Sequence, residues 1–294
     1  MSKNKYFSIL DSLTETNSKP AELNDRVLLV DGLNTFIRAW TTSPVTNDDG
    51  VHVGGITGSL LSLGYAIKNI KPTRVVICWD GRGGSQRRRK LFPEYKASRR
   101  NKVNLNRSFQ GNVDKEADNQ NMKMQLGRLV QYLDNLPVST LALENIEADD
   151  SIAYACKQVL TESQCFIMSS DKDFIQLHRF SFVKQYDPIR NRWIENENPT
   201  QYLQEHIIRG DRSDGIPNIL TCDDAIVNNK AQKKMSKEKI SALASMQPED
   251  FTNYIRLRNW KRNSELIDFA KIPRPIVDNI LTVSYTHLTL PTKA

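Results

Sequence analysis

The sequence has few of the features that mark secreted, membrane or zinc-binding proteins. Its four cysteines, Cys78, Cys156, Cys165 and Cys222, are scattered and include no CxxC pair. This argues against structural zinc and a disulfide framework and favours a reducing compartment. No stretch approaches 18 uncharged apolar residues, so we expect no transmembrane helix. The polar N-terminus has no long apolar segment, which argues against a secretory signal.

Several common catalytic signatures are also missing. There is no GxxxxGK(S/T) phosphate loop, no GxSxG turn and no GxGxxG after an apolar run. The sequence therefore shows none of the usual motifs for nucleotide hydrolysis or serine-hydrolase chemistry. The four histidines form no HxxxH pair, and we expect packing or surface roles for them. They are His52, His178, His206 and His287.

The chain is long enough for a substantial core, with 294 residues of which 39% are hydrophobic. Residues 1–24 form a polar extension. The last twelve residues, VSYTHLTLPTKA, break from the preceding sequence and resemble a translated sequencing adapter. We interpret 283–294 as a non-native tail, exclude it from fold reasoning, and expect the natural chain to diverge near Thr282.

The positive charge of the chain is concentrated in one segment. The net charge is +7, but residues 82–102 contain nine Lys or Arg and a single acid, Glu94. This segment has a net charge of +8, so the rest of the chain is close to neutral. Such a patch is expected of a protein that binds a phosphate backbone, although a solvated charged loop has the same composition.

Short apolar runs alternate with helical patterns over the first two thirds of the chain. The runs are 27–30, 75–79, 141–143 and 165–168, and the helical patterns are 56–70, 117–135 and 149–161. Continuous β-branched runs are typical of strands buried on both faces. The alternation predicts an α/β fold with a mainly parallel, twisted sheet flanked by helices. Polar helices are expected over 223–247 and 249–260, in a smaller C-terminal region.

Each predicted strand is followed by acidic residues. Asp31 and Asp80 follow the first two strands, Glu147, Asp149 and Asp150 the third, and Asp171 and Asp173 the fourth. Singly, each acid could belong to a turn, a helix N-cap or a polar loop. Together, at one edge of a parallel sheet, they would repel one another unless cations neutralise them. Oxygen ligands without His or Cys favour Mg²⁺ or Mn²⁺.

Two further details concern these acids. GDRSDGI (210–216) supplies a fifth acidic group, Asp211 and Asp214. In SSDKD (169–173), an extended backbone would send Asp171 and Asp173 to one side and Lys172 to the other. Lys172 then need not neutralise the two aspartates, and divalent cations could do so instead.

The sequence resembles the flap-endonuclease/5′→3′ exonuclease family, most of all its bacteriophage ribonuclease H branch. The matching motifs are VDGLN (30–34), ICWDGRGG (77–84), RRKLFPEYKASRR (88–100), IEADDSIA (146–153), SSDKDFIQL (169–177) and GDRSDGI (210–216). The resemblance implies a PIN-like 5′-nuclease core over 25–209, with a basic helical arch at 82–102. It also implies a helical DNA-binding region over 210–282.

The resemblance implies the following site residues. One metal would be held by Asp31, Asp80, Glu147 and Asp149, with Asp171 near or between two ions, and the other by Asp173, Asp214 and Asp211. Asp150 would be a neighbour or an N-cap. Lys96 would be catalytic. Arg87, Arg88, Lys96, Arg99 and Arg100 would contact phosphates, Tyr95 would stack on a base, and Thr57 and Gly58 would lie near duplex DNA.

The function implied is Mg²⁺-dependent 5′→3′ exonuclease and flap-endonuclease activity that removes RNA primers, with two Mg²⁺ ions for which Mn²⁺ could substitute. PNILTCDDAIVNN (217–229) lacks the glycines of the relatives' potassium-binding helix–turn–helix, so a potassium ion is doubtful. The alternatives are a PIN-type ribonuclease and a non-catalytic, structure-specific DNA-binding protein.

The resemblance also implies partners. The nucleic-acid partners are DNA with 5′ flaps, nicks or RNA primers, and candidate protein partners are a single-strand-binding protein and a sliding clamp. We expect a monomer without membrane attachment, encoded by a phage and acting in the host cytoplasm.

Overall fold

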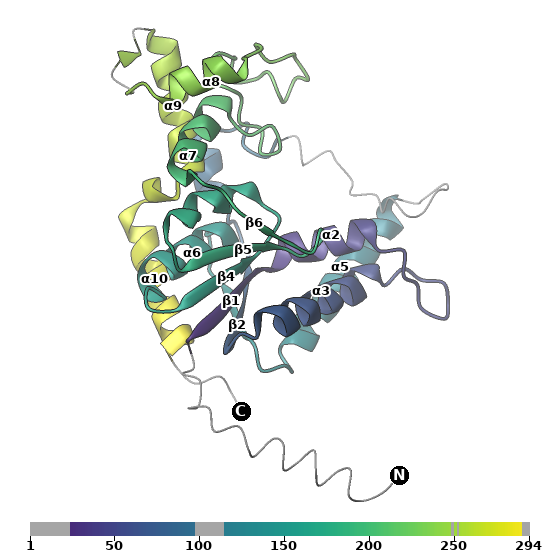
Figure 1. The fold of residues 1–294 in the computed structure, drawn as a ribbon. Helices are drawn as coiled ribbons and strands as arrows, with labels where there is room; N and C mark the ends of the chain where they lie inside the picture. The colour runs from purple at the N-terminus through teal and green to yellow at the C-terminus, as the bar shows by residue number, and fades with distance from the viewer. Residues whose placement is uncertain (1–23, 98–114, 248–249, 252, 290–294) are drawn as a thin grey trace, which may run out of the picture.

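Six strands form a single sheet in the order β3-β2-β1-β4-β5-β6 (Figure 1). The computed structural model describes residues 24–97, 115–247, 250–251 and 253–289. Strands β1 to β5 pair in parallel, and β6 runs antiparallel to β5. The strands are β1 Arg26–Asp31, β2 Arg74–Trp79, β3 Ser139–Ala142, β4 Gln164–Met168, β5 Val183–Asp187 and β6 Arg192–Ile194. The predicted α/β class, with a mainly parallel sheet, is confirmed.

Side chains of the central strands alternate between two apolar layers. In β1, Val27 and Leu29 join one cluster, while Leu28 and Val30 join the other. All four are at most 3% exposed. This alternation follows from the two-residue period of a strand, and helices cover both faces. The continuous apolar runs in the sequence therefore reflect burial on both sides.

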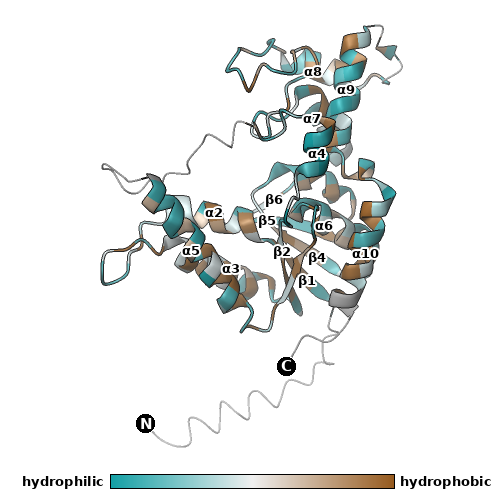
Figure 2. Ribbon diagram, turned by 180° about the vertical axis from the view of Figure 1, so that it is seen from behind, coloured by the Kyte–Doolittle hydropathy of each residue, from teal (hydrophilic) through white to brown (hydrophobic). Residues whose placement is uncertain are grey.

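Helices form a layer on each side of the sheet (Figure 1). One layer contains α2 Gly32–Thr42, α3 Gly54–Ile70 and α5 Lys115–Leu133. The other contains α6 Ala148–Tyr154, which continues as a π-helix over Ala155–Val159, and α10 Arg274–Thr289. Figure 2 shows hydrophobic strands at the centre between these layers.

A third group of helices lies beyond the sheet, at the top of Figure 1. It contains α7 Pro199–Arg209, α8 Lys237–Ala244 and α9 Tyr254–Ile267. The short, hydrophilic α4 Gln86–Leu91 contacts α9 (Figure 2). Phe92 and Tyr95, which follow α4, share an apolar cluster with residues of α7 and α9. The basic segment is thus packed against this group, at least as far as residue 97.

The structure corrects the helices expected after residue 222. Residues 223–229 form turns and 230–236 have no regular structure, so the predicted 223–247 helix is wrong except for α8. Asn229 has a left-handed φ of 52°, and the Ser236 side chain accepts a hydrogen bond from Lys239 N as the N-cap of α8. The helix expected over 249–260 begins later, after the N-cap Asn253, and continues to Ile267.

The C-terminal helix α10 belongs to the sheet rather than to the α7–α9 group. Val277, Ile280 and Leu288 are buried in the apolar cluster beneath the sheet. The predicted helical region 210–282 is therefore divided: α8 and α9 lie in the group beyond the sheet, and α10 packs against the sheet. Residues 283–289, which we excluded from fold reasoning, continue α10.

No helix in the described residues is both long enough and apolar enough to cross a membrane. Residues 1–23, Arg99, Arg100, the remainder of the arch from 98 to 102, and 290–294 lie outside the residues that the structure describes.

Candidate active site

Asp31 is the last residue of β1 and also the N-cap of α2. Its Oδ1 accepts a hydrogen bond from Asn34 N at 3.1 Å, and Ser169 Oγ, after β4, lies 3.2 Å from its Oδ2. Burial raises the pKa of Asp31 to about 7, against the hydrogen bond from Asn34 that lowers it. The negative charges of Asp171 and Asp80 raise it further. A carboxylate held in this way favours a bound proton or cation.

Asp80, after β2, contacts the start of α6. Its Oδ1 accepts a hydrogen bond from Ala148 N at 2.8 Å, which satisfies a free donor of the helix N-terminus. Gly81 is required beside it, because a Cβ at this position would lie 1.6 Å from the Leu143 carbonyl oxygen. This close approach joins the end of β2 to the loop that leads to Glu147.

Glu147 is buried between two cations. Lys96 Nζ lies 2.6 Å from Oε1, and Arg88 Nη1 contacts Oε2. Burial raises the pKa of Glu147, but the charges of Arg88 and Lys96 outweigh it and lower the value to about 2. Arg88 also pairs with Asp150, with 2.7 Å between Nη2 and Oδ1, and lies 3.6 Å from Asp149 Oδ2. The basic segment thus neutralises the start of α6 in the folded protein.

Asp171 and Asp173 lie at the start of a 3₁₀ helix over Lys172–Arg179, not on an extended strand. Asp171 is its N-cap, and its Oδ1 accepts a hydrogen bond from Asp173 N at 3.0 Å. The expected strand-like alternation is therefore wrong, because the N-cap bends the backbone at this point. The pKa of Asp173 is well above its usual value because of burial and the charges of Asp171, Asp214 and Asp211.

Gln185 of β5 holds this loop in place. Its Nε2 donates to the backbone oxygens of Ser169 at 2.8 Å and Asp171 at 2.5 Å. Its Oε1 lies 3.1 Å from His178 Nε2. Gln185 is fully buried, and neither it nor β5 was predicted, because VKQYD has too many polar residues to suggest a buried strand. The contacts that Gln185 makes with the Ser169–Asp171 loop and with His178 explain why a polar residue is buried here.

Most of the predicted acids line one cavity of about 520 Å³ at the carboxyl edge of the sheet. They are Asp31, Asp80, Glu147, Asp149, Asp171, Asp173 and Asp214. Lys96, Arg38 and Arg212 also line it. Asp211 instead lines an adjoining cavity of about 580 Å³, which shares Asp171 and Asp173.

The donor set of this cavity fits divalent cations. Its ligands are oxygens from five separate segments, as hard cations require. Burial raises the pKa values of Asp149 and Asp171, and Asp173 Oδ1 accepts no hydrogen bond in the described part of the chain. A cation would remove both the repulsion and this unsatisfied acceptor.

Two residues predicted to bind nucleic acid are placed differently. Tyr95 is 1% exposed, and its hydroxyl lies 3.1 Å from Glu147 Oε2 and 3.0 Å from Asp214 Oδ2. Arg88 is 3% exposed and fully engaged in ion pairs. The structure contradicts base stacking by Tyr95 and phosphate contact by Arg88, because both side chains support the acidic cluster instead.

Other predicted nucleic-acid residues lie at the cavity margin or in helix packing. The Arg87 side chain is 13% exposed, with Nη2 3.9 Å from Asp150 Oδ2. Thr57 Oγ1 donates to Val53 O within α3. At Gly58, a Cβ would lie 3.0 Å from the Ala39 side chain, so glycine lets α3 pack closely against α2.

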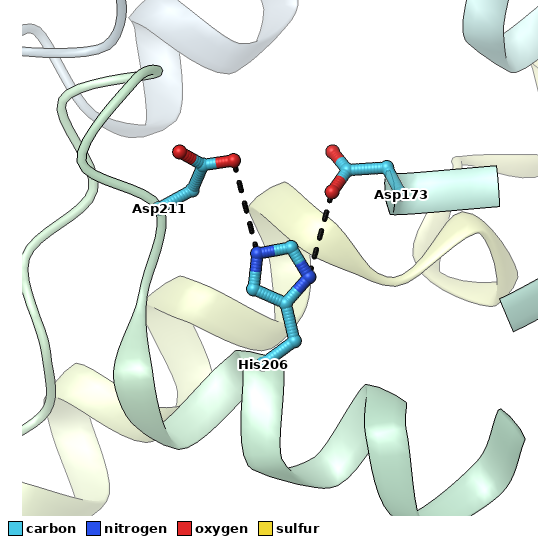
Figure 3. A group of neighbouring side chains, drawn as sticks. All are labelled: Asp173, His206 and Asp211. Atoms are coloured by element: carbon cyan, nitrogen blue, oxygen red, sulfur yellow. Dashed lines mark ion pairs between the residues drawn. The ribbon is translucent and has the colours of Figure 1, made fainter. Parts of the chain in front are cut away.

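His206, for which we expected a packing or surface role, lies between two of the acids (Figure 3). Its Nδ1 is 3.4 Å from Asp173 Oδ1 and its Nε2 is 3.7 Å from Asp211 Oδ2. Burial raises the pKa of Asp211, but the contacts that Asp211 makes with His206 and Ser213 outweigh it and lower the value well below its usual range. The sequence signal that could have identified His206 is its position four residues before the acidic motif GDRSD (210–214).

Carboxylates gathered at the carboxyl edge of a parallel sheet, with a basic segment packed against them, are the arrangement that a metal-dependent nuclease requires. The protein family described as "5'-3' exonuclease, N-terminal resolvase-like domain" matches residues 26–207. The chain therefore belongs to this family of metal-dependent 5′→3′ exonucleases and flap endonucleases. The predicted family resemblance is confirmed.

Two curated proteins illustrate the relationship. Ribonuclease H of Enterobacteria phage T4 is 27% identical over 243 residues, covering 79% of this chain and 77% of that protein. A 5′-3′ exonuclease of Bacillus subtilis is 31% identical over 159 residues, covering 52% of this chain and 48% of that protein. The chain thus spans about half the length of the second relative.

Solved structures share the fold. A bacteriophage T5 flap endonuclease in a complex with DNA and metal ions has a TM-score of 0.63 and 16% identity, covering 90% of this chain and all of that one. The T5 protein co-crystallised with metal ions has a TM-score of 0.61, covering 89% and 98%. At this identity the likeness concerns the fold alone.

Proposed function

We propose that this chain hydrolyses phosphodiester bonds at 5′ ends, as a 5′→3′ exonuclease and flap endonuclease that acts on 5′ flaps, nicks and RNA primers. The observation that carries the proposal is the single cavity lined by seven carboxylates at the sheet edge. The relative named Ribonuclease H, from phage T4, supports RNA among the substrates. We also propose that the protein is phage-encoded and acts in the host cytoplasm. Membership of the exonuclease family argues against the PIN-type ribonuclease and non-catalytic alternatives.

Two Mg²⁺ ions are the proposed cofactors, with Mn²⁺ as a substitute. Asp31, Asp80, Glu147 and Asp149 would hold one ion, and Asp173, Asp211 and Asp214 the other, with Asp171 near both. When bound, such ions activate water and stabilise the charge on the phosphate oxygens. The raised pKa values of Asp31, Asp171 and Asp173 support cation binding here. No potassium ion is included.

The chain's own residues orient the carboxylates and neutralise charge. Arg88 holds Glu147 and Asp150 from within the core, so the start of α6 is fixed before substrate binds. Lys96 pairs with Glu147 at 2.6 Å and lies 3.8 Å from Asp214 Oδ2. Since Lys96 lines the cavity, its ammonium group is placed to contact a substrate phosphate there.

The proposed DNA-binding surface surrounds the cavity. Arg38 and Arg212 are exposed at its margin and offer positive charge to a phosphate backbone. Thr57 and Gly58 lie in the first turns of α3, and Gly58 and Arg38 both line a cavity of about 210 Å³. Arg87, Arg99 and Arg100 belong to the proposed basic arch. A single-strand-binding protein and a sliding clamp remain proposed protein partners.

A cleavage assay tests this function. The full chain is incubated with 5′-labelled flap DNA, nicked DNA, RNA-primed duplex and single-stranded RNA, each with Mg²⁺ or with EDTA. We expect cleavage of the first three substrates with Mg²⁺ and none with EDTA. Cleavage confined to single-stranded RNA would instead favour a PIN-type ribonuclease, and flap binding without cleavage would favour a non-catalytic protein.

A further inference from the structure

The contacts around His206 differ from those of the other ionisable side chains at the cavity. His206 is 5% exposed and its two ring nitrogens face carboxylates from different elements. Asp173 comes from the 3₁₀ helix after β4, and Asp211 from the loop after α7 (Figure 3). One ligand atom from each of the three residues can be chosen so that all lie within 4.8 Å of one another.

The separation of His206 Nδ1 from Asp173 Oδ1 fits two ligands of one ion better than a direct hydrogen bond. The two nitrogen–oxygen distances, 3.4 and 3.7 Å, exceed the usual length of about 2.8 Å for a charged hydrogen bond. Ligand atoms that each lie about 2.1 Å from a metal are roughly 3.0–3.5 Å apart. An imidazole binds one ion through one nitrogen, so a cation here would bind one ring nitrogen of His206 together with one oxygen each of Asp173 and Asp211, ligand atoms that lie within 4.8 Å of one another. Small adjustments of the side chains would bring all three atoms to the cation.

The surroundings of Asp173 Oδ1 also favour a cation at this position. Asp173 Oδ1, the atom that faces His206, is buried and accepts no hydrogen bond in the described residues. Buried carboxylate oxygens normally have a donor or a metal as partner. His206 Nδ1 faces this oxygen at 3.4 Å, which is longer than an ordinary charged hydrogen bond.

The ring is held firmly at this position. His206 O accepts a hydrogen bond from Gly210 N at 2.8 Å, which closes the end of α7. Gly210 has a φ of 69°, and a Cβ there would lie 2.4 Å from Ile216 O. Glycine therefore permits the sharp turn that brings Asp211 back towards His206. Tyr202 contacts the ring edge-on at a centroid distance of 5.8 Å.

We propose that His206 is a metal ligand, and that with Asp173 and Asp211 it makes the second metal position a mixed nitrogen–oxygen site. Because imidazole binds transition metals better than Mg²⁺, this position would favour ions such as Mn²⁺ and Co²⁺. The inference rests on the proposed function, since it assigns a further ligand to one of its two metals. It separates this position from the all-oxygen site around Asp31 and Asp80.

Pulsed EPR of bound Mn²⁺ tests the ligand directly and does not depend on activity. We expect the full-length chain to show ¹⁴N coupling from a coordinated imidazole. The coupling should disappear in His206→Asn and persist in His178→Asn, since His178 is a half-buried histidine bonded to Gln185 and outside the acidic cavity. Mn²⁺ bound by the unmodified chain without any ¹⁴N coupling would overturn the proposal, whatever the variants do.

Calorimetric titration with Co²⁺ and with Mg²⁺ distinguishes a ligand from a residue that only positions carboxylates. For a ligand, His206→Asn should weaken Co²⁺ binding at one site by at least about 10-fold, the smallest loss typical of removing even an outer partner of a ligand. The Mg²⁺ affinity should change by less than about twofold, because the amide oxygen is a hard ligand. Equal losses for both metals would show a positioning role and contradict the proposal.

The two hypotheses fail separately. Flap cleavage with Mg²⁺ but no nitrogen coupling to Mn²⁺ would leave the nuclease function standing and remove His206 from the ligands. Nitrogen coupling in a protein that cleaves no 5′ substrate would support the ligand assignment and contradict the function.

Discussion

At the scale of single residues, the carboxylates of the cavity differ in what surrounds them before a metal binds. Glu147 already has two cationic partners, so its pKa is lowered to about 2. Asp31 has hydrogen bonds from Asn34 and Ser169 but lies near like charges, so burial and repulsion raise its pKa to about 7. We infer that a bound cation would stabilise the ionised form of Asp31 more than that of Glu147, which is already neutralised.

This difference predicts a pH dependence of stability in EDTA. Asp31 has a higher pKa in the folded protein than its usual 3.8, so between about pH 4 and 7 the folded state binds more protons than the unfolded state. The free energy of unfolding should therefore fall as pH rises through this window. Asp31→Asn should make this decrease in the free energy of unfolding smaller, by at most ~4 kcal/mol.

Urea denaturation at pH 5 and pH 8 measures this effect. Exposed Asp278, which pairs with Arg274 on α10, provides a charge-matched control as Asp278→Asn. Adding Mg²⁺ at pH 8 should restore stability in the unmodified protein. Identical pH dependence in Asp31→Asn and in the unmodified protein would contradict the assigned pKa.

At the scale of elements, Arg88 connects three helices. It extends from α4, pairs with Glu147 and Asp150 at the start of α6, and its Nε donates to Leu266 O of α9 at 3.1 Å. A buried ion pair of this kind fixes geometry, and loss of one partner leaves an unpaired buried charge. Arg88 thus sets how α4 and α9 lie against the acidic cluster.

Arg88→Met should lower the free energy of unfolding by about 3–5 kcal/mol, because Glu147 and Asp150 lose their buried counter-ion. Lys90→Ala, an exposed position on the same helix, should change it by less than about 0.5 kcal/mol. Chemical denaturation compares the two. Unchanged stability of Arg88→Met together with weaker, less salt-dependent DNA binding would restore the phosphate-contact role that we first expected.

The sequence predicts the elements whose signals are local. Val27 to Asp31 shows both a buried strand and its acidic end, and the same holds for β2 and β4. Burial of Tyr95 could not be predicted, since its partners Glu147 and Asp214 lie 52 and 119 residues away. His206 was missed for a similar reason, as α7 brings it to Asp173 only after folding.

At the scale of the whole molecule, the positively charged side chains near the cavity fall into two groups with different roles. Arg88 and Lys96 are directed into the acidic cluster, so they add little to an outer surface. Arg38 and Arg212 lie exposed at the cavity margin, from α2 and from the loop after α7. DNA that reaches the cavity would therefore contact both the sheet domain and the C-terminal helical group.

Arg38→Ala combined with Arg212→Ala should weaken binding of flap DNA and lower the slope of log affinity against log salt by about 1–2, since each phosphate contact contributes roughly 0.9. Fluorescence anisotropy across a salt series measures the slope. Arg128→Ala, at an exposed position on α5 and outside the cavity, should leave the slope unchanged. An unaltered slope in the double variant would show that the DNA phosphates do not contact Arg38 and Arg212.

The central claim is that the acidic cavity is a metal-dependent 5′-nuclease site. Single-turnover cleavage of a 5′-flap substrate by Asp171→Asn tests it most directly, because Asp171 lines both cavities and caps the helix that carries Asp173. We predict a loss of at least about 100-fold in cleavage rate with Mg²⁺, the scale of a lost charge-stabilising group, while flap affinity stays within about twofold and Asp278→Asn cleaves normally. Near-normal cleavage by Asp171→Asn would contradict the assignment of this site.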